Sequence, residues 1–379
     1  MKNLSRNQKR RQEKKYRLKK TILEIDLKAL GHNFNVISSK LSSQTKFMAV
    51  VKANGYGSNS VEIAKRLASL GVDYFAVAFV SEGIALRKSG IKTPILVLLP
   101  QVESIKEIIK YDLEPSLYSF YFLDNFLEYL KSSDIKKYPC HFKINTGLNR
   151  VGFNEKEAEK AIKKIKSCNS VRLVSIYSHL AATDDNRESK FTLSQISLFK
   201  KISSHVKSKL SYSPILHMSN TSGIYNYPEC ELDMVRSGIG LYGYNNKLNN
   251  ELKPVHRLKS IISQIIEAKK GDSIGYNRAF ICKEKTKVGI IPLGHADGIS
   301  RSFSNNGHVI VGGKKAKIIG NICMDVIMIN LNGFDVLEGD EVIIFDKINN
   351  AEHFANSVGT ISYEILTNIS ERIQRKILK

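Results

Sequence analysis

Apolar and polar residues follow two different patterns along the chain. From about residue 22 to 245, short apolar runs are followed by amphipathic segments whose apolar residues recur every three or four positions. A continuous apolar run predicts a strand covered on both faces, and the longer period predicts a helix packed over it. About eight such pairs succeed one another, which favours a (β/α)8 barrel. The expected strands are 46–52, 74–80, 94–100, 113–119, 140–145, 171–179, 214–220 and 233–243.

After about residue 250 the pattern changes. Short runs rich in Val and Ile are separated by Gly, Asn and Asp, as in 308–331, and this predicts a domain of short strands and turns. The last segment, 361–378, has a helical period. We therefore expect an α/β protein with an N-terminal (β/α)8 TIM-like barrel and a C-terminal all-β domain. The expected parts are a basic, disordered tail at 1–20, a barrel at 21–250 and a β-domain at 251–379.

The composition is that of a chain with a large folded core. Of its 379 residues, 42% are hydrophobic, yet no apolar run approaches the roughly 20 residues of a membrane span. The N-terminal segment is basic and lacks the apolar stretch of a signal peptide. We therefore expect a cytoplasmic protein with no membrane partner.

The charge is strongly positive, with a formal net charge of +22. Residues 1–20 hold ten basic residues and one acidic residue. Such a block is usually solvated, although it can also bind nucleic acid or an acidic surface. The tail contains no aromatic residue except Tyr16, which disfavours specific nucleic-acid binding.

The cysteines give no sign of a disulfide framework or a zinc site. There are five of them, scattered and without C-x-x-C spacing, whereas both kinds of site need paired or clustered cysteines. We expect no metal. The five are Cys140, Cys168, Cys230, Cys282 and Cys323.

The apolar run 47–51 ends on a cation, Lys52, and a Gly-Tyr-Gly turn follows at 55–57. In the simplest interpretation the strand reaches solvent at this lysine. Alternatively, Lys52 projects into a pocket at the carboxyl end of a strand, where α/β folds place their chemistry. A desolvated amine there can form a Schiff base with a carbonyl. A kinase lysine also ends a strand, but the sequence contains neither H-R-D nor D-F-G.

Further polar residues fall at the carboxyl ends of the predicted strands, which meet at one face of a barrel. They are largely cationic and short of carboxylates, whereas a metal hydrolase needs clusters of Asp, Glu and His. Two nearby glycines allow a close backbone approach, and backbone N–H groups can cradle a phosphate. These ends therefore predict a site for an anion that carries a carbonyl. The residues are Lys52, Tyr56, Lys143, Arg150, His179, Asn220, Thr221, Arg236, Gly238 and Gly240.

Eight short motifs stand in order along both expected domains. They are AVVKANGYG, KINTGLNRVGF, HLAATDD, VRSGIGLYG, SIGYNRAF, GHADG, GNICMD and SYEIL. Together they resemble alanine racemase, a fold-type III enzyme dependent on pyridoxal 5′-phosphate (PLP). The resemblance covers nearly the whole chain from about residue 22 and leaves out the basic tail.

The resemblance implies a homodimer whose two active sites are each completed by the partner's β-domain. It implies that Lys52 forms the Schiff base with PLP and that two bases on opposite faces racemise alanine. Lys52 would act on the D-isomer, and Tyr276 of the other subunit on the L-isomer. A tyrosine has an ordinary pKa near ~10, so a relay of His179 and Arg236 would have to stabilise its phenolate. The implied role is to supply D-alanine for bacterial peptidoglycan.

Other positions match the family residue by residue. Arg236 corresponds to the partner of the pyridine nitrogen, where many PLP enzymes place a carboxylate. Arg150 corresponds to the residue that bonds the cofactor's phenolic oxygen and holds the substrate carboxylate. Lys143 corresponds to a lysine that is often carbamylated, and its carbamate would orient Arg150. Met324 and Asp325 correspond to the substrate entrance. The phosphate-binding and other cofactor-binding matches are Tyr56, His179, Asn220, Thr221, Gly238, Ile239 and Tyr363.

Two positions depart from the family pattern. His295 stands where the family usually has a tyrosine at the inner gate, which questions strict alanine specificity. Thr221 stands where serine is usual, and it keeps the hydroxyl needed for phosphate binding.

Three alternatives remain open besides a racemase of broader specificity that would also accept serine. A fold-type III decarboxylase shares the barrel and the lysine, but it would prefer an acidic partner at the pyridine nitrogen. A single-barrel PLP-binding protein would lack the β-domain with Tyr276. A nucleic-acid-binding role would depend on residues 1–20.

Overall fold

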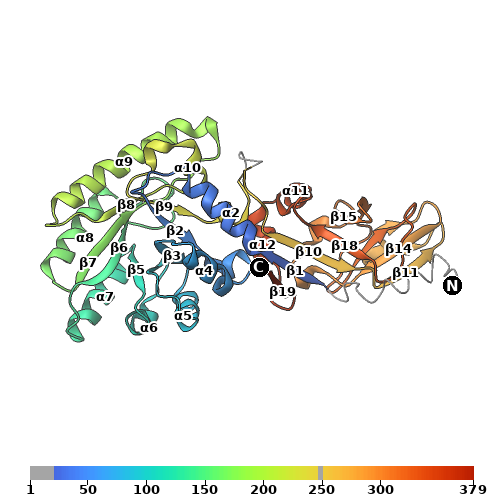
Figure 1. Ribbon diagram of the computed structural model, residues 1–379, viewed down its shortest axis with the longest axis horizontal. Helices are drawn as coiled ribbons and strands as arrows, with labels where there is room; N and C mark the ends of the chain where they lie inside the picture. Colours follow the sequence, from blue (N-terminus) through green and yellow to red (C-terminus); the bar gives the residue numbers. More distant parts are fainter. Residues whose placement is uncertain (1–20, 246–250) are drawn as a thin grey trace, which may run out of the picture. The chain divides into compact units, whose positions relative to one another are not determined.

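The computed structural model describes residues 21–245 and 251–379 (Figure 1). The basic tail expected at 1–20 lies outside the described residues. The described chain divides into two compact units, a barrel unit from Ala29 to Lys253 and a β-unit that combines residues 21–28 with Pro254–Lys379.

The barrel unit is built on one sheet of parallel strands in the order β8-β7-β6-β5-β4-β3-β2-β9. Two backbone hydrogen bonds join its ends, from Asp233 N to Leu216 O and from Arg236 N to Ser219 O, both 3.1 Å. This arrangement confirms the predicted barrel and its eight strands. They are β2 Lys46–Val50, β3 Tyr74–Val77, β4 Ile95–Val97, β5 Glu114–Leu117, β6 Tyr138–Lys143, β7 Val171–Tyr177, β8 Ile215–His217 and β9 Met234–Ser237.

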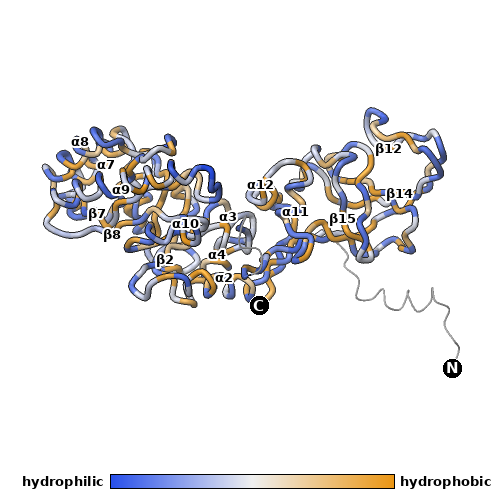
Figure 2. The backbone as a smooth tube through the Cα atoms, turned by 90° about the horizontal axis from the view of Figure 1, so that it is seen from above, coloured by the Kyte–Doolittle hydropathy of each residue, from blue (hydrophilic) through white to orange (hydrophobic). Residues whose placement is uncertain are grey.

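Helices cover the outside of these strands (Figure 1). Helix α8 shows why the sequence forms them. Its Asn154 side chain accepts from Glu157 N and the Glu157 carboxylate accepts from Asn154 N, so a capping box starts the helix. Its apolar residues fall on one buried face, and Figure 2 shows hydrophobic and hydrophilic stretches alternating along α7, α8 and α9. The helices are α2 Leu27–Ser38, α4 Ser60–Ser69, α5 Val80–Lys88, α6 Ile105–Lys110, α7 Phe120–Ser132, α8 Glu155–Ser167, α9 Ser189–Ser208 and α10 Thr221–Asn226.

The β-unit contains three sheets, ordered β16-β15-β18-β10-β1-β19, β11-β14-β17 and β12-β13. Its two short helices are α11 Ala351–Asn356 and α12 Ser362–Thr367. The predicted domain of short strands is thus confirmed. The strands are β1 Ile22–Asp26, β10 His256–Ile261, β11 Gln264–Ala268, β12 Ser273–Ile274, β13 Phe280–Ile281, β14 Thr286–Ile291, β15 His308–Val311, β16 Lys314–Lys317, β17 Ile327–Asn330, β18 Glu341–Phe345 and β19 Gln374–Leu378.

Two expectations differ from the structure. The barrel was expected to start at residue 21, but β1 pairs antiparallel with β10 and parallel with β19 in the β-unit. Leu23 and Ile25 are fully buried there, and Glu24 forms ion pairs with Lys259 and Lys376. The final segment was expected to be helical, but α12 ends at Thr367 and the chain continues as β19. β19 forms a strand because it pairs with β1, which is far away in the sequence, and the local spacing of apolar residues does not reveal such a pairing.

None of the helices in the described ranges is long and apolar enough to cross a membrane.

Candidate active site

Lys52 begins a left-handed turn directly after β2. Ala53, Asn54 and Tyr56 have φ values of 52°, 52° and 53°, and Gly55 has a φ of 64°. Left-handed backbone costs residues with a Cβ roughly 1–2 kcal/mol each, so the surroundings must hold this turn in place. The Asn54 side chain accepts from Ser60 N at 3.0 Å.

A carboxylate from the neighbouring helix also holds the turn. Glu82 of α5 accepts a hydrogen bond from Ala53 N at 2.6 Å and another from Ala78 N at 2.7 Å. Glu82 therefore links the turn after β2 to the loop after β3. Strain at the carboxyl end of a barrel strand is typical of a functional position.

The left-handed turn brings Tyr56 against the loop after β9. A Cβ built on Gly238 would lie 2.9 Å from Tyr56 Cζ and closer still to the hydroxyl oxygen. On Gly240, an added Cβ would collide with the Thr221 methyl group. Thr221 Oγ1 lies 3.0 Å from Ser237 Oγ, and Asn220 caps α10 by accepting from Gly223 N at 2.9 Å. The hydroxyl groups of these residues and the glycine backbone of the loop after β9 therefore lie close together at one end of the barrel.

Arg236 is the buried cation of this site, with 4% of its surface exposed. Its Nη1 donates to His217 Nδ1 at 2.7 Å. Its Nη2 donates to Ser178 O at 2.7 Å and to His179 Nδ1 at 3.0 Å. Each of these acceptors is neutral: Ser178 O is a carbonyl oxygen, and a histidine ring nitrogen that accepts a hydrogen bond carries no proton. Burial lowers the pKa of Arg236 to about 10.

Three further basic residues, Lys52, Lys143 and Arg150, belong to this site, and burial together with repulsion between like charges lowers the pKa of both lysines. Burial and the neighbouring Arg150 guanidinium lower the pKa of Lys52. Burial, Arg236 and Arg150 lower the pKa of Lys143 well below its ordinary value. Lys143 Nζ lies 4.7 Å from the centre of the Tyr177 ring, and Arg236 Cζ lies 5.4 Å from it. Neutral amines are nucleophiles and bases, so these shifts favour chemistry at both lysines.

The structure thus brings the barrel residues predicted from sequence to one end of the sheet. The pKa of His179 lies well below its ordinary value, mainly because the ring is buried and also because it is near the cations Arg236, Lys143, Arg150 and Lys52. These groups are therefore close enough to affect one another.

The β-unit brings a second group of predicted residues together. His295 N donates to Cys323 O at 2.9 Å, so the 294–298 loop lies along the 320–325 loop that carries Met324. Asn321 Nδ2 donates to Tyr276 O at 3.0 Å and adds the 276–278 loop. Tyr276 and Met324 are exposed.

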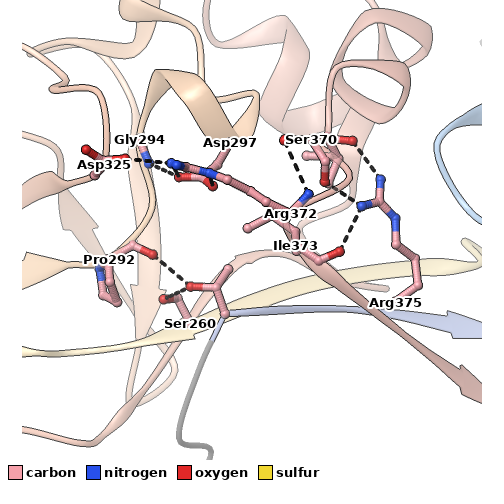
Figure 3. A network of polar contacts seen from close by, with 11 residues as sticks. Ser260, Pro292, Gly294, Asp297, Asp325, Ser370, Arg372, Ile373 and Arg375 are labelled. Carbon is pink, nitrogen blue, oxygen red and sulfur yellow. Dashed lines mark hydrogen bonds and ion pairs between the residues drawn. The ribbon is translucent and has the colours of Figure 1, made fainter.

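Arg372 ties these loops to the end of the chain (Figure 3). It donates to both carboxylate oxygens of Asp297, at 2.6 and 3.0 Å, and to Asp325 at 2.8 Å. Asp297 is buried and also accepts from Gly294 N at 2.8 Å. The 294–298 and 320–325 loops therefore form one connected platform. Tyr363, on α12, is exposed.

Sequence reasoning missed several residues of both groups. His217, Tyr177 and Glu82 shape the barrel end, while Asp297 and Arg372 shape the loop platform. A histidine and a tyrosine inside otherwise apolar strands were the available signal for the first two. No local pattern marks Arg372, because its partners come from distant loops.

Comparison with known proteins gives a consistent result. The chain matches the family model "Alanine racemase, N-terminal domain" over residues 25–246 and "Alanine racemase, C-terminal domain" over residues 255–377. It is 37% identical over 366 residues to an alanine racemase of Thermodesulfovibrio yellowstonii, covering 94% of this chain and 97% of the relative.

Solved structures agree with the sequence matches. The alanine racemase of Clostridium difficile 630 superposes with a TM-score of 0.89 at 34% identity, covering 95% of this chain and 96% of that one. An alanine racemase from Bartonella henselae, solved with covalently bound pyridoxal phosphate, gives a TM-score of 0.87 at 28% identity and covers 95% of this chain and all of that one.

Proposed function

The chain belongs to the alanine racemase family, and from this premise we propose that it interconverts L-alanine and D-alanine with PLP held on Lys52. The observation that best supports this over a decarboxylase is Arg236. A buried guanidinium with neutral acceptors occupies the position where a decarboxylase would prefer a carboxylate. The family assignment and this residue therefore favour the same reaction.

The barrel end fits PLP in three respects. The missing side chain at Gly238 lets Tyr56 pack against the loop after β9, so the Tyr56 and Thr221 hydroxyls and the Ile239 backbone would bind the phosphate. Lys52 supplies an amine with a lowered pKa. Within the described residues, Arg236 Nε has no protein acceptor, so it is available to the cofactor ring. Asn220, His179 and Tyr363 complete the proposed cofactor-binding set.

When bound, PLP links covalently to an amine through its aldehyde and weakens the Cα–H bond of a linked amino acid. Lys52 Nζ then moves a proton on one face of the substrate Cα, acting on the D-isomer. Tyr276 Oη moves a proton on the opposite face, acting on the L-isomer. One base removes the Cα proton from its face and the other base delivers its own proton to the opposite face, so the configuration inverts.

Arg236 limits how far charge is withdrawn from the substrate. A guanidinium donates hydrogen bonds and accepts none, so the ring nitrogen beside it stays unprotonated. PLP held in this way would withdraw less charge from the substrate, which would suppress side reactions such as transamination.

Arg150 binds the substrate carboxylate in this proposal, and Lys143 orients Arg150. Burial and the neighbouring guanidinium groups lower the pKa of Lys143 and so favour its neutral amine, and a neutral amine can add to CO₂ to give a carbamate and one released proton. The carbamate would place an anion among Lys52, Arg150 and Arg236, which offsets their repulsion.

The sites are completed in a homodimer, with Tyr276 and Met324 supplied by the partner chain. The proposed product serves peptidoglycan synthesis in the cytoplasm. His295 in the 294–298 loop replaces the usual gate tyrosine, so serine is the first alternative substrate to test.

The test combines a spectrum with chiral analysis. PLP-loaded wild type should show a visible cofactor band and convert L-alanine to the racemate, whereas Lys52→Ala should do neither. Lys46→Ala, at the exposed start of the same strand, is the matched control and should behave as wild type. A yellow wild-type protein that leaves L-alanine unchanged would contradict the proposal, and L-serine measured in parallel would show whether the substrate differs.

A further inference from the structure

A line of polar side chains crosses the interior of the barrel and ends at Arg236. The Glu114 carboxylate lies 2.7 Å from His141 Nε2, and His141 Nδ1 lies 2.6 Å from Ser175 Oγ. Ser175 Oγ lies 2.9 Å from His217 Nε2, and His217 Nδ1 lies 2.7 Å from Arg236 Nη1. These residues belong to β5, β6, β7, β8 and β9 in turn. We call these five side chains the Glu114–Arg236 chain.

The Glu114–Arg236 chain is buried along almost its whole length. His141, Ser175 and His217 have no exposed surface, and the Glu114 side chain is 13% exposed. The interior of a barrel is normally filled with branched apolar side chains, and Met48, Leu96 and other apolar residues do fill it here. Buried polar groups destabilise a fold unless every one is hydrogen-bonded. Packing alone therefore gives no reason for two histidines and a serine here.

With both histidines neutral, all four contacts are satisfied and the Ser175 hydroxyl proton also has an acceptor. Arg236 can only donate, so His217 Nδ1 is an acceptor and its proton sits on Nε2. That proton is donated to Ser175 Oγ, whose own hydroxyl proton is donated to His141 Nδ1. His141 Nε2–H is then donated to Glu114. Both histidines are neutral in this arrangement, and every hydrogen bond runs from the cation toward the carboxylate.

The two ends of the chain carry opposite charge. Arg236 has no carboxylate among its hydrogen-bond partners in the described residues, and burial lowers its pKa to about 10. Hydrogen bonds in a common direction polarise one another. The negative charge of Glu114 therefore reaches Arg236 through three neutral groups, although the two residues are not in contact.

We propose that Glu114 is a positioning residue for the active site, which acts through His141, Ser175 and His217 as the remote counter-charge that fixes the orientation and charge of Arg236. The carboxylate fixes the tautomer of His141, and each residue fixes the next as far as the guanidinium. The part of this inference that concerns the cofactor rests on the proposed function, because there Arg236 faces the pyridine nitrogen.

The test is a double-mutant cycle of wild type, Glu114→Gln, Ser175→Ala and the double variant. Glu114→Gln keeps an acceptor for His141 and removes only the charge. Ser175→Ala breaks the chain in the middle. Glu128→Gln, an exposed glutamate on α7, is the matched control. Each protein is loaded with PLP carrying ¹⁵N in its ring, and the ring resonance, kcat and KM for L-alanine and the urea unfolding curve are measured.

We expect Glu114→Gln to shift the ring ¹⁵N resonance and to lower kcat about 2- to 30-fold, the range of remote coupling effects, with a smaller change in KM. In the Ser175→Ala background the same substitution should change neither quantity further, and the losses of stability should be less than additive. Glu128→Gln should match wild type. A purely structural role would not move the ring resonance.

The proposal is overturned if Glu114→Gln leaves the resonance and kcat at wild-type values. It is also overturned if the substitution has its full effect when Ser175 is absent. Ser175→Cys, whose thiol is a weak donor and acceptor, replaces Ser175→Ala if the alanine variant does not fold. If the wild type binds PLP but does not racemise alanine, only the proposed function is refuted. The ring ¹⁵N resonance and the double-mutant cycle of unfolding free energies still test the Glu114–Arg236 chain in that case.

Discussion

Gly238→Ala tests the cofactor cradle at its tightest point. The new Cβ would lie 2.9 Å from Tyr56 Cζ, whereas carbon atoms pack at about 3.5–4.0 Å. The Tyr56 ring would have to retreat by roughly 1 Å to restore such a contact. It has no room to do so, because Tyr56 is 6% exposed and its ring centre lies 4.7 Å from that of the fully buried Tyr242.

Two effects of different size should follow. Overpacking should lower the free energy of unfolding by about 1–3 kcal/mol. Displacing the Tyr56 hydroxyl should remove one hydrogen bond to the phosphate, and a bond to a charged group contributes about 1.5–3 kcal/mol. That loss corresponds to a roughly 10- to 150-fold weaker affinity for PLP.

The assay is a titration of the cofactor-free protein with PLP, followed by visible absorption, together with urea unfolding. Gly71→Ala is the control, since Gly71 has a φ of 86° and no atom within 4 Å of an added Cβ. It should lose stability and keep wild-type affinity. Tyr56→Phe should weaken PLP as much as Gly238→Ala does, and the double variant should be no weaker. A folded Gly238→Ala protein that binds PLP as wild type does would refute the cradle.

Three further outcomes are expected. Asp297→Ala should lower the free energy of unfolding by about 1–3 kcal/mol in urea, because it leaves Gly294 N and Arg372 without their shared acceptor; an unchanged curve would contradict the platform. Burial raises the pKa of Glu24, but the Lys259 hydrogen bond and nearby cations outweigh it and leave that pKa below 4.5. Its stabilisation should be present above about pH 4.5 and lost as pH falls through the lowered value, so Glu24→Gln should flatten this acid loss in melting curves. Asn154→Ala should cost about 1 kcal/mol by circular dichroism melts, as the loss of a helix cap does, and a neutral result would count against the capping box.

Much of the barrel could be predicted because its signals are local. Most barrel strands are short apolar runs, and the longer helices have an apolar period and often a cap, as at Asn154. The position of Lys52 after β2 followed from the same pattern. Its chemistry did not, because a lysine that reaches solvent gives the same string of residues.

The remainder depends on contacts between distant segments. The sequence pattern put residues 22–26 within the barrel bounds of 21–250, and only the pairing of β1 with β10 and β19 places them in the β-unit. The chain from Glu114 to Arg236 is assembled from five strands, each contributing one residue. The left-handed turn after Lys52 was also hidden, since Ala53 and Asn54 do not require positive φ on their own.

The central claim is that Lys52 of one chain and Tyr276 of another act on opposite faces of the same substrate. To test it, the dimers of the variants Lys52→Ala and Tyr276→Phe, each inactive alone, are dissociated, mixed and allowed to reassociate. Random pairing makes about half of the dimers mixed, and each mixed dimer has one site with both native residues. The account therefore predicts recovery of roughly a quarter of wild-type alanine racemisation. A mixture that stays as inactive as its two components would contradict it.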